Sequence, residues 1–222
     1  MLPFARRAIT IGVLKDPYAL LAGYPAGSQQ DTYWGELWPS SITLADAILD
    51  GSLALPSGPD PILEIGCGAG LATVAAAIAG GRVLATDRDP HALVLARENA
   101  SRNGVAEQVE YRLLDWRENC TARHGLILAA DCMYRAGAAG EVAWFIAQAL
   151  RSAPGARAIV VDPDRLTARY FNFIAQEAGL KVRMFQREVP FVTTHGPVKE
   201  LPSGPVRNPS RQPLEVTFYE LT

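Results

Sequence analysis

The stretch from Pro61 to Asp87 constrains the fold more than any other part of the chain, because a glycine-rich turn separates two short apolar runs. The first run ends at Ile65 and predicts a strand, while the alanine-rich segment from Leu71 to Ile78 predicts a helix that packs on a sheet. A second apolar run, Arg82 to Thr86, predicts another strand, with an acid at its end. The stretch therefore predicts a βαβ unit whose acid lies at the edge where open α/β sheets bind ligands.

The spacing of the glycines restricts which class of ligand the turn can bind. Gly66, Gly68 and Gly70 form G-x-G-x-G, whereas the dinucleotide fingerprint G-x-G-x-x-G requires a glycine where this chain has Leu71. This argues against NAD. Glycines let a ligand approach the backbone, and a helix amino end offers N–H groups to carboxylates as well as to phosphates, so the turn alone leaves the ligand open.

Two acids flank this turn, and we expect both to face the crevice. Glu64 lies two residues before the first glycine, and Asp87 ends the second strand, where its carboxylate can accept hydrogen bonds from both hydroxyls of a ribose. Arg88 follows directly and is included in the predicted cofactor-binding set. The whole unit is typical of a nucleoside site.

The motifs E-I-G-C-G-A-G, beginning at Glu64, and A-T-D, ending at Asp87, resemble those of the class I S-adenosylmethionine (SAM) methyltransferases. In that family an acid precedes G-x-G-x-G, and the second strand ends in an acid that binds ribose. The resemblance implies a Rossmann-like fold with SAM as cofactor. The alternative is a structural turn in another α/β protein, with a chance acid at the strand end.

Composition limits the organisation and the partners. The 222 residues suffice for one α/β domain, which we divide into an extension and lid over residues 1–50 and a methyltransferase domain over residues 51–222. Lysine and arginine number 21 against 23 acids, giving net charge −2 and pI ≈ 5.9. This balance gives no basic surface for nucleic acid, and no apolar run is long enough for a membrane span.

Cysteines and histidines give no metal pattern, and no metal is expected. The three cysteines lack C-x-x-C spacing, which favours free thiols in a reducing compartment, and the three histidines are scattered. The amino terminus lacks a signal-peptide pattern. We therefore expect a cytoplasmic protein. The residues concerned are Cys67, Cys120, Cys132, His91, His124 and His195.

An aromatic cluster precedes the βαβ unit, in the sequence W-G-E-L-W-P-S. Pro39 fits the first turn of a helix that continues to about Asp50. The segment resembles the one before the SAM domain in the seven-β-strand protein-lysine methyltransferases (the methyltransferase-like 21 group). That resemblance implies that Trp34, Glu36 and Trp38 border the substrate channel and that Trp38 also covers the cofactor. Alternatively, the aromatic side chains simply plug one end of the sheet.

The third predicted strand, residues 109–114, ends in Asp115 and Trp116 and follows a helix predicted from Asp89 to Asn103. An acid can accept a hydrogen bond from the adenine amino group and an indole can lie on the purine face, so this pair suits an adenosine pocket. The alternatives are a helix cap for Asp115 and a core position for Trp116.

The fourth predicted strand, residues 125–130, ends at Ala130, which we include in the cofactor-binding set, and D-x-x-Y follows it. The same lysine methyltransferase group carries this motif here, which implies substrate-binding and catalytic roles for Asp131 and Tyr134. Asp131 can bind a lysine ammonium, and Tyr134 and Trp38 can flank the cation. The alternatives are a helix cap for Asp131 and simple packing for Tyr134.

The last third of the chain completes the predicted fold. Residues 156–161 predict a fifth strand ending in D-P-D-R, similar to the D-P-G-R of relatives that methylate the electron-transfer flavoprotein β subunit, and a helix should follow over residues 166–179. Residues 181–191 and 214–221 predict a closing pair with the last strand at the sheet edge, and the loop between them a substrate flap. The fold class is α/β: a doubly wound, mostly parallel seven-stranded sheet with an N-terminal helical extension and an antiparallel last strand.

The motifs together predict a SAM-dependent methyltransferase that methylates an amine, with a protein lysine as the favoured acceptor. Two alternatives stay open. A small-molecule N- or O-methyltransferase would share the cofactor half of the chain, and a non-catalytic SAM-binding domain would share the fold.

Overall fold

The computed structural model describes residues 2–4, 7–16, 32–118, 123–189 and 214–222. The predicted Cys120 thiol and the predicted flap over residues 195–213 lie outside this part of the chain. The strands are β1 (Leu2–Phe4), β2 (Arg7–Ile9), β3 (Ile62–Ile65), β4 (Val83–Asp87), β5 (Val109–Leu113), β6 (Leu126–Ala130), β7 (Arg157–Asp162), β8 (Val182–Glu188) and β9 (Glu215–Leu221). The helices are η1 (Tyr33–Gly35), α2 (Pro39–Leu49), α3 (Leu71–Ile78), α4 (Pro90–Arg102), η2 (Ala106–Gln108), α5 (Ala138–Ser152) and α6 (Phe171–Glu177).

The main sheet has seven strands in the order β5-β4-β3-β6-β7-β9-β8, and β3 to β7 are parallel. β9 runs antiparallel to both of its neighbours. The chain enters the main sheet at β3 in its middle and continues outward through β4 to β5. It then crosses back to β6, which lies beside β3. The predicted doubly wound fold class is therefore confirmed.

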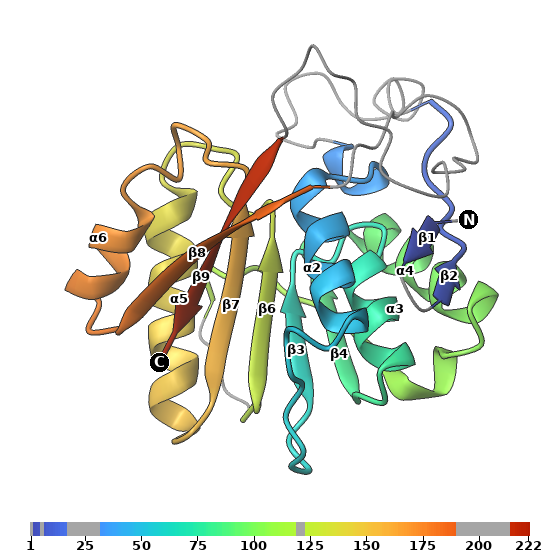
Figure 1. The fold of residues 1–222 in the computed structure, drawn as a ribbon, viewed down its shortest axis with the longest axis horizontal. Helices are drawn as coiled ribbons and strands as arrows, with labels where there is room; N and C mark the ends of the chain where they lie inside the picture. The colour runs from blue at the N-terminus through green and yellow to red at the C-terminus, as the bar shows by residue number, and fades with distance from the viewer. Residues whose placement is uncertain (1, 5–6, 17–31, 119–122, 190–213) are drawn as a thin grey trace.

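Two helix layers cover this sheet. α2, α3 and α4 lie over one face and α5 and α6 over the other (Figure 1). Each face has its own buried hydrophobic cluster, and the sheet separates the two clusters. α3 is buried along nearly its whole length, since its small alanine side chains let α2 pack closely against it. The result is the three-layer architecture in which parallel strands are buried on both faces.

Strand β9 occupies a different place from the predicted one. We expected residues 214–221 at the sheet edge, but β9 lies between β7 and β8, and β8 is the edge strand. The physical reason is burial on both faces, because Phe218 belongs to one hydrophobic cluster and the adjacent Tyr219 to the other. Its continuous burial is typical of an interior strand.

The helix after β7 is shorter than predicted. It was expected over residues 166–179, but α6 begins at Phe171, and residues 166–170 form turns instead. The Thr167 hydroxyl donates a hydrogen bond to the Met133 carbonyl, and the Arg165 amide donates to Asp162 Oδ1 at 2.8 Å. These contacts hold the segment after β7 against the end of β6.

The N-terminal segment is tied to the glycine turn by one buried amide. Asn99 of α4 donates to the carbonyls of Gly12 (3.0 Å) and Ala69 (2.8 Å), and its Oδ1 accepts from the Gly12 amide at 2.8 Å. The two-stranded sheet of β1 and β2 was not predicted, whereas α2 is the helix expected in the extension. The lid function of residues 1–50 stays a prediction. No helix in the described ranges has the length and apolar character of a membrane span.

Glu64 is a buried acid in the central strand β3. It is 2% exposed, and the Thr73 hydroxyl of α3 donates a hydrogen bond to Oε2. Burial is the largest influence and raises the pKa of Glu64 to about 7, although the Thr73 hydrogen bonds oppose the rise. An ionised carboxylate at this position therefore works against folding at neutral pH and above.

We expect Glu64→Gln to stabilise the fold above pH 7 and to change little below pH 4.5. Because the pKa of Glu64 is higher in the folded protein than in the unfolded chain, the free energy of unfolding is greatest below pH 4.5, the ordinary pKa of a glutamate. It decreases as the pH rises through about 7. The loss is on the order of 3 kcal/mol in the wild type, because each pKa unit corresponds to about 1.4 kcal/mol. Thermal unfolding of both proteins between pH 4.5 and 8.5 measures the difference.

The exposed glutamate Glu98 supplies the control, since Glu98→Gln makes the same chemical change on the surface of α4. It should shift the melting temperature equally at all pH values. A Glu64→Gln protein that is less stable than the wild type at pH 8.5 would show that the ionised carboxylate stabilises the fold.

Candidate functional site

A cavity of about 800 Å³ opens at the carboxyl ends of the central strands. Every residue predicted for the site contributes to its wall. From the segment before the βαβ unit and from that unit these are Trp34, Glu36, Trp38, Glu64, Gly66, Gly68, Gly70, Asp87 and Arg88, and from the later strand ends Asp115, Trp116, Ala130, Asp131 and Tyr134. Residues from across the first 134 positions thus meet at one site, although their individual roles stay predictions.

The glycine turn between β3 and α3 brings its backbone against the cavity. Gly66 and Gly68 have φ of 64° and 51°, a left-handed conformation that favours glycine. A Cβ on Gly66 would lie 2.9 Å from Cys132 Sγ, and one on Gly68 would lie 3.1 Å from the Trp34 carbonyl oxygen. Any side chain would therefore collide with the cavity wall, so the exposed backbone depends on glycine at both positions.

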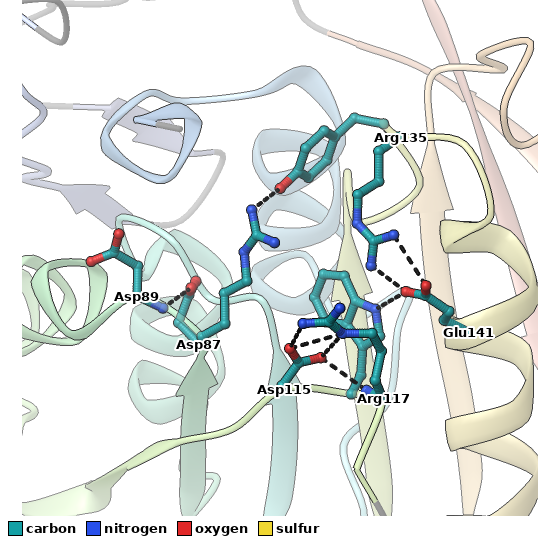
Figure 2. A network of polar contacts seen from close by, with 9 residues as sticks. Asp87, Asp89, Asp115, Arg117, Arg135 and Glu141 are labelled. Atoms are coloured by element: carbon teal, nitrogen blue, oxygen red, sulfur yellow. Dashed lines mark hydrogen bonds and ion pairs between the residues drawn. The ribbon is translucent and has the colours of Figure 1, made fainter. Parts of the chain in front are cut away.

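Asp87 ends β4 beside this turn and is held by two backbone amides. Oδ2 accepts from Gly68 N and Oδ1 from Asp89 N, each at 3.0 Å (the Asp89 bond is drawn in Figure 2). Burial raises the pKa of Asp87 to about 6, and these two hydrogen bonds oppose the rise. A carboxylate has about four lone-pair positions, so both oxygens retain capacity for further donors such as ribose hydroxyls.

Trp116 is buried beside the turn, and its indole is oriented by a polar network (Figure 2). Its Nε1 donates to Glu141 Oε2 at 3.2 Å, and Glu141 also forms an ion pair with Arg135. Asp115 is ion-paired with Arg117 and accepts from the Arg117 amide at 3.0 Å, so it forms a local turn as well as lining the cavity. Arg117 lowers the pKa of Asp115. The ring plane of the buried indole is thus set before any ligand binds.

Aromatic rings cluster at the other side of the cavity. Tyr33 makes edge contacts with Trp38 and Tyr134, with ring centroids 5.8 Å and 5.6 Å apart. Trp38 Nε1 donates to the Tyr33 carbonyl at 2.9 Å. The Tyr134 hydroxyl lies 3.4 Å from Arg88 Nη2 (Figure 2), which connects this cluster to the end of β4. Tyr33 was not in the predicted site, although its position beside Trp34 was an available signal.

Asp131 follows β6 and is fixed in an unusual conformation. Its φ is 57°, one of two positive values among the described residues other than glycine. Oδ2 accepts from the Ser40 amide at the amino end of α2 at 3.0 Å, and Oδ1 lies 2.5 Å from Arg165 Nη1. Burial raises the pKa of Asp131, while Arg165 and Ser40 oppose the rise. The helix end and the guanidinium together stabilise the carboxylate form.

Arg165, like Tyr33, lines the cavity but was not in the predicted site. Asp131 was predicted as an ammonium-binding acid with no partner named for it, and in the structure it is ion-paired with Arg165, which also lies over the Trp38 ring at 5.6 Å. The signal was present in D-P-D-R, because this charged segment follows β7, the parallel neighbour of β6. Strand ends that are adjacent in the sheet place their side chains at one edge.

Comparisons with known proteins agree with this architecture. The family model described as lysine methyltransferase matches residues 28–172, more than half of the chain. An electron transfer flavoprotein beta subunit lysine methyltransferase from Xenopus laevis is 30% identical over 136 residues, covering 61% of this chain and 54% of the relative. A ribosomal protein L11 methyltransferase from Syntrophotalea carbinolica is 46% identical over 59 residues, covering 26% and 19%. The chain thus spans about half or less of the length of these relatives.

Solved structures share the fold at low sequence identity. A TehB-like SAM-dependent methyltransferase from Corynebacterium glutamicum has a TM-score of 0.55 and 20% identity, with 92% of this chain and 93% of that chain covered. A glycopeptide N-methyltransferase has a TM-score of 0.59 and 10% identity, with 84% and 92% covered. These similarities show the fold alone.

The residues of the cavity fit S-adenosylmethionine chemically. The glycine backbone, whose Cβ positions are filled by neighbouring atoms, allows close approach of the amino-acid part, Asp87 has capacity for ribose hydroxyls, and the fixed indole of Trp116 offers an apolar surface. The predicted cofactor and family are confirmed by the comparisons. The chain belongs to the lysine methyltransferase family and has the fold of the SAM-dependent methyltransferases, with S-adenosylmethionine as its cofactor.

Proposed function

We propose that this protein transfers a methyl group from S-adenosylmethionine to an amine, and that the amine is the side chain of a lysine in another protein. The observation that carries this proposal is that the buried Asp131 carboxylate lines the same cavity as the aromatic rings of Trp38 and Tyr134, which both contact Tyr33. A carboxylate binds an ammonium group directly, and aromatic faces stabilise a cation beside it. The family model and the name of the Xenopus relative point to the same acceptor.

The chemistry requires an electrophilic methyl group, which the bound cofactor supplies on its sulfonium. The bound cofactor would donate that methyl group to a neutral acceptor nitrogen and would itself leave as the thioether. Holding both partners in line would supply most of the catalysis. In this chain the glycine turn and Asp87 would hold the cofactor, and the corner around Asp131 would hold the acceptor.

The acceptor must lose a proton, because a lysine amine with a reference pKa near 10.4 is mostly charged at neutral pH. Asp131 binds the ammonium form and positions its nitrogen. The proton then leaves either to Asp131 or to water. Burial, which raises the pKa of Asp131, favours proton uptake, while the ion pair with Arg165 favours the charged form that binds the ammonium.

The acceptor class is tested with purified protein and SAM labelled in its methyl group. We expect methyl incorporation into a protein acceptor, and the relatives name two candidates for the panel, electron transfer flavoprotein β subunit and ribosomal protein L11. Mass spectrometry of the labelled product should locate the methyl group on a lysine. Incorporation into a metabolite extract and into no protein would favour the small-molecule alternative. Tight SAM binding with turnover on neither kind of acceptor would favour a non-catalytic domain.

Asp87→Ala should weaken SAM binding by about tenfold to a hundredfold for each ribose hydrogen bond that it removes, because a charge-assisted hydrogen bond contributes about 1.5–3 kcal/mol. In the wild type, affinity should rise as pH increases through about 6, where Asp87 ionises, and this component should disappear in the variant. Calorimetric titration between pH 5 and 8 measures both effects. NADH serves as the control ligand, and tighter binding of NADH than of SAM would contradict the assigned cofactor.

Asp131→Asn should leave SAM affinity within a few fold and reduce turnover by about a hundredfold or more, the magnitude of an oriented catalytic group. Asparagine keeps the shape and the acceptor for the Ser40 amide but removes the charge that binds the ammonium. Asp115→Ala is the comparison variant, since it should mainly weaken SAM binding, whereas Asp131→Asn should mainly reduce turnover. Full turnover of Asp131→Asn on an identified acceptor would remove the main support for an amine substrate.

A further inference from the structure

Three charged side chains form a compact group where β6 and β7 end. Arg165 Nη1 lies 2.5 Å from Asp131 Oδ1 and 3.0 Å from Asp162 Oδ2. The two aspartates are 7% and 0% exposed, whereas the Arg165 side chain is 23% exposed and reaches the cavity. One guanidinium therefore serves two buried carboxylates. We call Asp131, Asp162 and Arg165 the charged triad, and its formal net charge is −1.

The position of the guanidinium is fixed by more than its two ion pairs. The Arg165 amide donates to Asp162 Oδ1 at 2.8 Å, and the guanidinium carbon lies 5.6 Å from the centre of the Trp38 ring. Asp162 itself does not line the cavity in the described part of the chain. Asp162 influences the cavity through its ion pair with Arg165, because Arg165 is also ion-paired with Asp131.

Other titratable groups surround the charged triad. Asp164 on the same loop is exposed, Tyr219 of β9 is buried near Asp162, and Cys132 follows Asp131 as a buried thiol whose pKa burial raises. Glu64 and Asp87 lie deeper in the same cavity, and Tyr134 and the exposed Glu36 lie at its aromatic side. Within the described residues Arg165 is the cation whose ion pairs reach Asp131 and Asp162.

We propose that the charged triad selects an acceptor carrying one positive charge, a protonated amine, over a neutral hydroxyl or an anionic carboxylate, and that Arg165 is the positioning residue that keeps Asp131 ionised. This inference rests on the proposed function and specifies the acceptor class of the same site. Two buried carboxylates alone would share a proton, because like charges disfavour simultaneous ionisation. Arg165 contacts both carboxylates and opposes the burial that raises the pKa of each. When both are ionised, one negative charge is left for the acceptor to neutralise.

Asp131 has the capacity to receive that acceptor. Its carboxylate has about four lone-pair positions, and the Ser40 amide and Arg165 account for two of them. Asp131 lines the cavity, so its remaining lone-pair positions belong to a residue of the cavity wall. We therefore place the ammonium on Asp131 beside Arg165 rather than in its place.

A set of variants that changes the triad charge tests this proposal directly. Asp162→Asn makes the net charge 0, Arg165→Gln makes it −2, and the double variant returns it to −1. The probe is n-butylammonium, which matches the end of a lysine side chain, and 1-butanol is the neutral control. Binding to each protein, saturated with S-adenosylhomocysteine, is measured by saturation-transfer NMR.

We expect Asp162→Asn to weaken n-butylammonium binding by about tenfold, the effect of about 1.4 kcal/mol, and the double variant to recover most of the loss. 1-Butanol should bind all variants equally. Arg165→Gln should bind the cation progressively less well as pH falls toward neutral, since the two carboxylates then share a proton. Arg165→Lys, which keeps the charge, should restore a pH dependence close to that of the wild type.

Asp164→Asn is the matched control, because it makes the same change two residues from Asp162 on an exposed side chain, and asparagine tolerates the positive φ of 60° there. It should bind both probes as the wild type does, and thermal unfolding verifies that every variant is folded. If the double variant binds n-butylammonium no better than Asp162→Asn, the charge proposal is overturned and the triad only joins β6 to β7. The proposed function fails separately, if the acceptor panel shows methyl transfer to an oxygen or to no acceptor.

Discussion

The close approach of the glycine turn to its neighbours is the constraint on which the site depends. The turn must pass between Cys132 of the β6 end, Trp34 of the N-terminal segment and Ala96 of α4, where a Cβ on its glycines would lie about 3 Å from existing atoms. Because of this fit, one short loop contacts the end of β6, the aromatic segment and a helix at once. The turn therefore joins the predicted cofactor-binding and acceptor-binding sides of the cavity.

Buried hydrogen bonds hold the turn and the neighbouring elements together, and we call this set of bonds the polar frame. Asp87 binds the turn through the Gly68 amide, and Asn99 binds it from behind through the Ala69 carbonyl. Asp131 binds the amino end of α2 through Ser40. Each of these side chains joins elements that are distant in sequence through at least one buried hydrogen bond, which lowers the cost of burying its polar group. The frame thus positions the predicted catalytic groups on strand ends and helix ends rather than on long loops.

Local patterns explain why much of the fold was predictable. The helix over residues 71–78, the strand ending at Asp87 and the strand ending at Ala130 are continuous, largely apolar runs preceded by glycine-containing segments, which are properties of neighbouring residues. The predicted site residues that follow strands line one cavity because parallel strands place their carboxyl ends at one edge, whereas Trp34, Glu36 and Trp38 reach it from the segment before α2.

The errors involve contacts between distant segments. The interior position of β9 depends on which hydrophobic surface the two core clusters leave for it. The ion pair between Asp131 and Arg165 depends on the adjacency of β6 and β7, which a motif search at each strand end does not consider. The sequence interpretation therefore placed Asp131 at the site but did not pair it with Arg165.

That charge environment links stability to function. Glu64, Asp87 and Asp131 are buried acids in one cavity, and burial raises the pKa of each of them. Such carboxylates work against folding when they ionise without a ligand. The same desolvation strengthens their attraction to a cation, because electrostatic interactions increase as the local dielectric falls. A sulfonium and an ammonium are both cations, whereas the thioether left after methyl transfer is neutral. Under the proposed function, the acids that cost stability in the free protein would therefore bind the cationic cofactor more tightly than its neutral, demethylated product.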